Sequence, residues 1–206
     1  MFNFFKKKYI DESLEDQLLD LSKEHPMLSS LAKNGKSCDC INEDISNLGH
    51  DINNPVPVNG IIGEMKYLNR LLCKCGTGLI YHRLGSIEVQ DIEEVVDVYE
   101  TVCAEGKHWD VLYLHMYHPR RSSLCPVGYS FNDFHPIFSK HPIGYGTHNF
   151  DKDFPFGVDE FMASFIGGTL GEKFAKKLTD IVSNRNNFIR PKQQEDKIKL
   201  IFPQNN

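Results

Sequence analysis

The sequence lacks long hydrophobic runs, and no segment approaches the roughly 20 consecutive apolar residues that a membrane-spanning helix needs. It also lacks a recognisable export signal, because the apolar start is short and is followed, not preceded, by three lysines. An excess of basic residues is absent too, since 23 lysines and arginines stand against 28 acidic residues, for a formal net charge of −5. These absences predict a cytoplasmic protein that has no transmembrane segment and does not bind nucleic acid through its phosphates.

The short motifs of common enzyme classes are missing as well. There is no Gly-x-Ser-x-Gly nucleophile motif, no Gly-x-Gly-x-x-Gly motif after a strand and no His-Glu-x-x-His metal motif. The sequence therefore leaves open whether the protein is an enzyme.

The composition is that of an ordinary globular protein, with 40% hydrophobic and 25% charged residues. A chain of 206 residues is long enough for one domain with a buried core and an extension. Residues 34–58 are polar and show little periodicity, which indicates a linker or an irregular loop. We therefore predict a helical N-terminal extension with a polar linker over residues 1–54 and a single domain over residues 55–206.

Apolar residues at helical spacing predict several helices. Asp11 is placed to cap the first of them, and Gly76 is placed to end a later one in a left-handed conformation, with Cys75 on the apolar stripe of that helix. We expect helices over about residues 11–24, 26–33, 59–75, 158–166 and 169–181, and a last edge strand over residues 197–202.

In the middle of the chain the pattern changes to residues typical of strands. We expect strands over about residues 79–83, 89–103 and 108–118. A two-residue hairpin loop at Glu105-Gly106 places Tyr99 opposite Leu112 and leaves both faces of the hairpin substantially apolar. The prediction is an α+β fold, in which a central antiparallel sheet around residues 79–118 is packed by helices and covered on both sides.

A long aromatic- and proline-rich loop is predicted over residues 119–157, which hold five of the ten prolines and eight aromatic residues. Loops of this length are uncommon in compact domains and are often functional. Histidines and carboxylates in this loop are candidate ligands of a catalytic divalent metal, although histidines in such loops are more often packing or turn residues. They are His135, His141, His148, Asp151 and Asp153.

Six cysteines include two Cys-x-Cys pairs. If the fold brings the pairs together, the four thiolates of Cys38, Cys40, Cys73 and Cys75 form a zinc site. The usual structural pair has at least two intervening residues, however, and a free cysteine also packs as a small hydrophobic residue. Both interpretations stay open.

A thiol nucleophile with a histidine base is another candidate, formed by Cys103 or Cys125 with His108 or His118. Cys103 is predicted opposite His108 across the hairpin, but a buried cysteine without a catalytic role explains the same pattern. A His-based hydrolase therefore remains an alternative.

Basic residues gather where two of the predicted strands end. In a meander the first and third strands run parallel, so their basic exits lie at the same edge of the sheet, about 10 Å apart. Guanidinium groups offer paired donors to a carboxylate or phosphate. Alternatively, Glu93 and Glu94 pair with the arginines at that edge and no function is needed. The candidate anion-binding residues are His82, Arg83, His118, Arg120 and Arg121.

These observations favour a cytoplasmic binding or interaction module that uses the basic strand edge to bind a protein partner or a small anionic ligand. Two alternatives stay open: a small hydrolase that is metal-dependent or His-based, and a zinc-stabilised structural protein.

Overall fold

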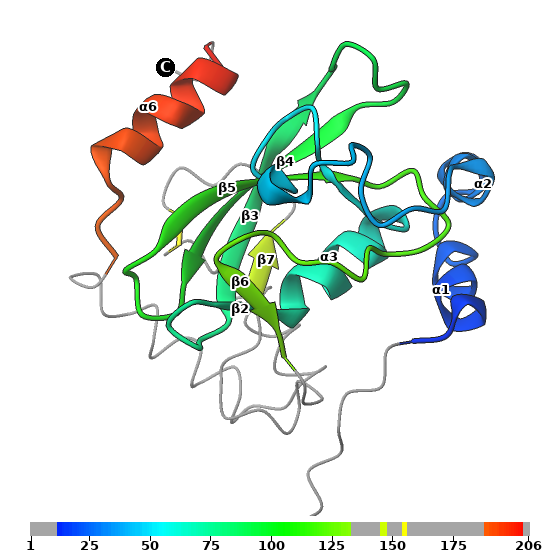
Figure 1. Cartoon of the computed structure of the whole chain (residues 1–206), viewed down its shortest axis with the longest axis horizontal. Coiled ribbons are helices and arrows are strands. Elements are labelled where there is room, and N and C mark those ends of the chain that lie inside the picture. Colours follow the sequence, from blue (N-terminus) through cyan, green and yellow to red (C-terminus); the bar gives the residue numbers. More distant parts are fainter. Residues whose placement is uncertain (1–11, 133–144, 148–153, 156–187, 204–206) are drawn as a thin grey trace, which may run out of the picture.

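The computed structural model describes residues 12–132, 145–147, 154–155 and 188–203 (Figure 1). The helices are α1 (Leu14–Leu21), α2 (Pro26–Asn34), the 3-10 helix η1 (Ile45–Asn47), α3 (Gly60–Arg70) and α6 (Lys192–Ile201). The strands are β1 (Val56–Pro57), β2 (Leu71–Cys73), β3 (Leu79–Ile87), β4 (Val96–Cys103), β5 (Trp109–His115), β6 (Tyr129–Phe131) and β7 (Tyr145–Thr147). Within these ranges no helix is long and apolar enough to cross a membrane.

Three antiparallel strands form the centre of the main sheet, because β4 pairs with β3 on one side and with β5 on the other. In the β4–β5 hairpin Tyr99 lies opposite Leu112, as predicted. Two short strands extend this sheet in parallel pairing, giving the order β1-β5-β4-β3-β7, and β2 pairs with β6 in a separate small sheet. The α+β fold with a central antiparallel sheet is confirmed. The parallel edge strands are too short to leave a pattern in the sequence.

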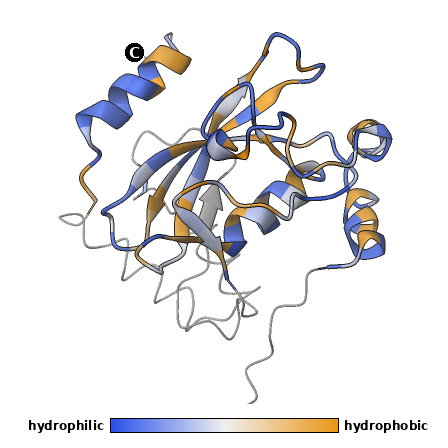
Figure 2. Cartoon of the chain, in the orientation of Figure 1, coloured by the Kyte–Doolittle hydropathy of each residue, from blue (hydrophilic) through white to orange (hydrophobic). Residues whose placement is uncertain are grey.

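Apolar side chains of β4 and β5 point alternately to the two faces of the main sheet, and both faces are covered. Tyr99 and Leu112 belong to one core cluster, together with Tyr67 of α3. Val98 and Val111 belong to a second cluster, against which α6 packs. Figure 1 shows α3 and α6 on different sides of the sheet, and Figure 2 shows that hydrophobic residues of α6 gather in its last turn.

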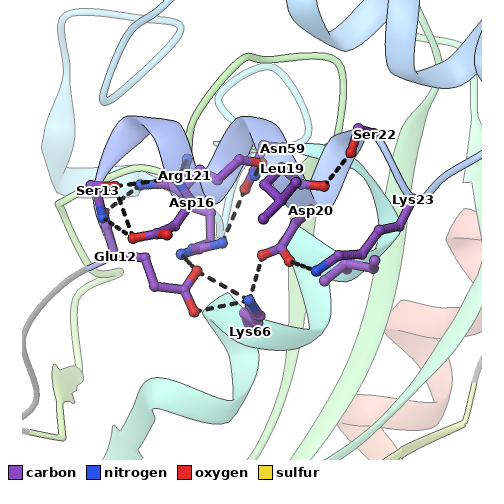
Figure 3. Close-up of polar contacts among 12 residues, drawn as sticks. Glu12, Ser13, Asp16, Leu19, Asp20, Ser22, Lys23, Asn59, Lys66 and Arg121 are labelled. Carbon is purple, nitrogen blue, oxygen red and sulfur yellow. Dashed lines mark hydrogen bonds and ion pairs between the residues drawn. The ribbon is translucent and has the colours of Figure 1, made fainter.

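Polar contacts hold α1 beside α3 (Figure 3). The ammonium of Lys66, in α3, donates to Glu12 at 2.9 Å and also to Asp20 of α1. The guanidinium of Arg121, which is only 4% exposed, donates to Glu12 at 2.8 Å and to Asn59 at 3.3 Å. Glu12 and α1 are therefore tied to Lys66, which precedes β3 in the sequence, and to Arg121, which follows β5.

The predicted helix through Cys75 is wrong. α3 ends at Arg70, and the chain continues directly as β2, which pairs antiparallel with Tyr129–Phe131. The apolar spacing suited either structure, and pairing with a strand far along the sequence decides between them. Gly76 does adopt a left-handed φ of 78°, but it closes a turn after β2 and does not cap a helix.

Other predicted boundaries differ less. α1 is capped by Ser13, whose side chain accepts a hydrogen bond from the Asp16 N–H, while Asp11 lies outside the described residues. α2 ends within one residue of the prediction. The predicted last strand is wrong, because most of those residues belong to α6; an apolar-polar alternation over so few residues fits both periods. The helices predicted within residues 158–181 also lie outside the described residues.

Candidate functional site

Two short turns have the same construction. In each, the carbonyl of a cysteine accepts a hydrogen bond at 2.7 Å from the N–H of a glycine three residues later: Gly76 donates to Cys73, and Gly106 donates to Cys103. Both glycines have positive φ, 78° and 74°, which residues with a side chain rarely adopt. The glycines thus allow each cysteine to open a tight turn, one after β2 and one between β4 and β5.

Strand pairing brings these two turns together. β3 begins just after the first turn, and its first residue, Leu79, pairs with Cys103 at the end of β4. The Ala104 N–H donates to the Gly78 carbonyl at 3.0 Å. His108 follows the second turn, and its carbonyl accepts from the Cys103 N–H at 3.0 Å. The start of β3, the end of β4 and the start of β5 therefore meet at one end of the sheet.

Four side chains of the types that bind metals converge there: Cys73, Cys75, Cys103 and His108. Their ligand atoms all lie within 4.8 Å of one another. The Nδ1 atom of His108 is 3.1 Å from Sγ of Cys73 and 3.7 Å from Sγ of Cys103. Cys73 and Cys103 are buried, whereas Cys75 and His108 are half-buried. In the part of the chain that the structure describes, no other group of three or more such side chains comes as close together.

Three thiolates and one imidazole are a donor set that binds zinc tetrahedrally. With Zn–S bonds of about 2.3 Å, a tetrahedral ion separates its sulfur ligands by about 3.8 Å. Starting from the observed spacing, the four side chains therefore need to move only a little to bind a tetrahedral zinc ion. Neighbouring polar groups contact the sulfurs: the His108 N–H donates to Sγ of Cys103 at 3.3 Å, and the Thr77 hydroxyl lies 3.1 Å from Sγ of Cys75. Contacts of this kind orient metal ligands.

The two thiols of the first turn differ in their proton affinity. Burial raises the pKa of Cys73 to about 12. Burial also acts to raise the pKa of Cys75, but hydrogen bonds from Thr77, His108 and Cys73 outweigh it and lower that pKa to about 6. A thiol with a low pKa supplies a thiolate near neutral pH, and a bound metal deprotonates its remaining thiol ligands.

Two of the four cysteines predicted as zinc ligands belong to this group, namely Cys73 and Cys75. Cys38 lies elsewhere, with Sγ 3.8 Å from Nδ1 of His118, and Cys40 packs at the edge of the larger core cluster. In their place stand Cys103 and His108, which the sequence suggested as a nucleophile and base. A repeated Cys-x-x-Gly at residues 73–76 and 103–106 is the signal that relates the two turns.

The first half of the predicted basic edge is paired with carboxylates of β4. Nε2 of His82 lies 2.8 Å from Oε2 of Glu100, and both side chains are fully buried. Arg83 donates through Nε to Asp97 at 2.8 Å. The partners of these residues are therefore carboxylates inside β4, whereas the sequence suggested the glutamates ahead of it.

The second half of that edge follows β5 and is paired in the same way. Arg120 donates to Asp39 at 2.7 Å, and the guanidinium of Arg121 is buried against Glu12. His118 is 5% exposed and contacts His115. Each arginine of the candidate anion site already binds a carboxylate of this chain, and the anion site stays a prediction.

The loop predicted over residues 119–157 is described over residues 119–132, 145–147 and 154–155. It contributes a strand to each sheet, β7 to the main one and β6 to the small one. The loop residues predicted as catalytic metal ligands, His135, His141, His148, Asp151 and Asp153, lie outside the described residues.

Comparison with protein-family models, with curated proteins and with solved structures gives no match. An α+β fold alone does not determine a function, so the chemistry of the site has to indicate it.

Proposed function

We propose that this protein is a non-catalytic binding module whose fold is stabilised by one zinc ion, held by Cys73, Cys75, Cys103 and His108. The observation that supports this function is the convergence of these four ligand atoms within 4.8 Å from two separate turns. Four protein ligands fill the coordination sphere of zinc, and a filled sphere is characteristic of structural sites.

Zinc at this position joins the small sheet to the main one, in addition to the apolar packing of Leu71 and Cys73 in the core cluster that the two sheets share. Cys73 belongs to β2 of the small sheet, whereas Cys103 and His108 belong to the hairpin of the main sheet. One ion therefore fastens the small sheet to the main one. Because the unfolded chain does not hold the ligands together, binding of the metal stabilises the folded state.

The hydrolase alternative is less well supported by this geometry. A catalytic zinc keeps an open position for water or substrate, and here the fourth position is taken by His108. Cys103 lies beside His108 but is fully buried, so a substrate does not reach it as a nucleophile.

The binding role is proposed at the basic edge, toward a protein partner or a small anionic ligand. The side chains of Arg83 and Arg120 are 29% and 27% exposed, so both are partly accessible. An incoming anion has to compete with the buried Asp97 at Arg83 and with the partly exposed Asp39 at Arg120. The pair at Arg120 is the easier of the two to displace, because ion pairs near the surface contribute only about 0–1 kcal/mol. Arg120→Ala tests this role, since it is expected to weaken binding of an acidic partner without unfolding the domain.

A cytoplasmic location is part of the proposal. All six cysteines are free thiols. Thiolate ligands persist in a reducing compartment, because oxidation to disulfides removes them from the metal.

Metal content per chain tests the proposed function. Untagged, natively purified protein is analysed by elemental mass spectrometry, and about one zinc per chain is expected. Cys103→Ser is expected to lower the zinc content to near background. Cys125→Ser is the control, because Cys125 packs against the core cluster that contains Cys103 but lies outside the ligand group.

The double variant Cys38→Ser/Cys40→Ser separates the two possible ligand sets. It is expected to retain zinc. Loss of zinc from this variant, with retention in Cys103→Ser, would establish the four-thiol site predicted from the sequence. Folded wild-type protein that takes up no zinc under reducing conditions contradicts both sets.

A further inference from the structure

A cavity of about 460 Å³ lies at the end of β5, away from the two cysteine turns. Three segments line it: the end of α2 with the residues after it, the connection between β3 and β4, and the chain at and after the end of β5. Leu31, Ile41 and Ile92 provide apolar surface. This volume is in the range of sites that hold small organic molecules.

Close backbone packing shapes one side of this cavity. A Cβ atom at Gly35 would lie 1.9 Å from the carbonyl oxygen of Tyr117, so only glycine allows the chain after α2 to come this near. The approach brings the Lys36 carbonyl to 2.5 Å from Nδ1 of His118.

That carbonyl determines which ring nitrogen carries the proton in two buried histidines, His118 and His115. A carbonyl only accepts, so Nδ1 of His118 must carry the proton and donate to Lys36, which leaves Nε2 of the neutral ring as an acceptor. Nδ1 of His115 lies 2.8 Å from that Nε2 and must therefore be the donor. As a result, Nε2 of His115 has a free lone pair.

Among the residues that the structure describes, the lone pair of His115 has no partner. His115 lines the cavity and is 7% exposed, and its Nε2 atom is buried without a hydrogen bond. Burial and the neighbouring His118 lower the pKa of His115 to about 4, although Asp97 acts in the opposite direction. At neutral pH a residue that lines the cavity therefore carries a buried acceptor that lacks a donor, which is costly unless a bound group supplies one.

Acidic side chains form another part of the cavity lining. Asp91, Glu93 and Glu94 all come from the β3–β4 connection, and none of them forms an ion pair within the described residues. The opposing charge is the single ammonium of Lys36. Asp91 has a φ of 70°, the one positive value at a non-glycine residue in the described ranges. Such backbone strain is frequent where side chains are held for binding.

We propose that this cavity binds a small molecule in which a protonated amine is joined to an apolar group. The carboxylates attract the ammonium, and Tyr117, which also lines the cavity, supplies an aromatic ring of the kind that stabilises cations. One N–H of the amine donates to Nε2 of His115. The apolar group lies against Leu31, Ile41 and Ile92. This site is separate from the proposed zinc centre and does not depend on it.

Three aromatic probes that share one apolar group test the proposal: benzylamine, benzyl alcohol and benzoate. Each is titrated into the full-length protein as purified, and the side-chain 1H–15N signals of the histidines are followed by NMR. Benzylamine is expected to shift the His115 signals saturably and to bind at least about tenfold more tightly than the neutral alcohol. Benzoate is expected not to bind.

Variants identify the groups responsible. Glu93→Gln/Glu94→Gln is expected to weaken benzylamine about tenfold, because two nearby charges are lost. Glu88→Gln is the matched control, since Glu88 is an exposed residue of the same connection but does not line the cavity. His115→Leu is expected to abolish the preference for the amine over the alcohol. Its fold is checked by the backbone amide spectrum, and His115→Gln, which keeps an acceptor, is expected to restore part of the preference.

Four results would overturn the proposal. They are equal binding of amine and alcohol, tighter binding of benzoate, unchanged benzylamine affinity in the double glutamine variant, and no saturable shift with any probe at concentrations up to about 10 mM, the range of weak fragment binding.

Discussion

Sγ of Cys73 lies 3.1 Å from Nδ1 of His108, although the two residues are 35 positions apart in the sequence. The sequence suggested Cys73 as a zinc ligand, but it suggested His108 only as the base of a thiol nucleophile. Their contact exists because β3 pairs with β4 and β4 pairs with β5, so that two turns meet. If zinc binds where the two turns meet, its most direct effect is to stabilise the folded protein.

Chelation is expected to destabilise the wild-type protein. A strong zinc chelator is expected to lower the melting temperature by roughly 5–10 °C, because the metal stabilises only the folded state. Cys103→Ser is expected to melt lower from the start and to show no further change with chelator. A melting temperature of wild type that chelator leaves unchanged would contradict a structural metal.

Glu100→Gln is expected to destabilise the sheet by about 3 kcal/mol, since it leaves charged donors facing a neutral amide in a buried site. Glu100 is fully buried and accepts from Arg190 at 2.8 Å through each of its two oxygens, and from His82. Urea unfolding measures the change. Glu105→Gln is the control, because Glu105 pairs with Lys107 in an exposed turn, and a change within about 0.5 kcal/mol is expected.

Glu64→Gln is expected to change how stability depends on pH. Burial raises the pKa of Glu64 well above its ordinary value of 4.5, nearby Asp97 adds to the effect, and the Tyr99 hydroxyl, which donates at 2.8 Å, opposes it. Above pH 4.5 the unfolded chain loses a proton that folded Glu64 keeps, so this carboxyl lowers stability as pH rises. Glutamine removes that loss.

The measurement for Glu64→Gln is urea unfolding of variant and wild type at several pH values. The difference in unfolding free energy is expected to shift in favour of the variant between about pH 5 and pH 8. A difference that stays constant over this interval would show that Glu64 ionises as readily in the folded protein as in the unfolded one. Glu43→Gln, at an exposed position, is expected to show no such slope.

Lys66→Met is expected to loosen α1 with little effect on the sheet. The substitution removes the ammonium that Glu12 and Asp20 share, while methionine keeps an unbranched apolar side chain at this position of α3. Amide hydrogen exchange is expected to become faster over Leu14–Leu21, with a loss of about 1 kcal/mol of local stability. Lys23→Met provides the control, since the Lys23 side chain is 57% exposed and, among the described residues, pairs with Asp20 alone. Equal acceleration in both variants would contradict a special role for Lys66.

Local signals in the sequence predicted the centre of the fold. The turn at Glu105-Gly106 is so short that it sets the β4–β5 register, and Tyr99 opposite Leu112 follows from it. The alternation along the hairpin predicted two covered faces, and α3 and α6 cover them.

The sequence did not predict which residues far apart in the chain pair with one another. β3 and β4 are joined by a longer connection, and their register shifts between Arg83 and Gly85, so no turn length specified that Leu79 meets Cys103. The same limit applies to the arginines. Arg120 and Asp39 are 81 positions apart, and nothing local indicated that they pair. The candidate site was therefore half identified, through the cysteines of the first turn alone.

The β3–β4 register also makes a bound zinc ion a check on strand pairing during folding. Side chains alternate between the faces of a strand, so a slip of one residue would turn Cys103 away from Cys73 and Cys75. A misaligned sheet then loses one ligand and most of its metal affinity. Zinc would bind tightly only when β3 and β4 pair in the native register. The two cysteine turns would thereby favour that register over the registers shifted by one residue.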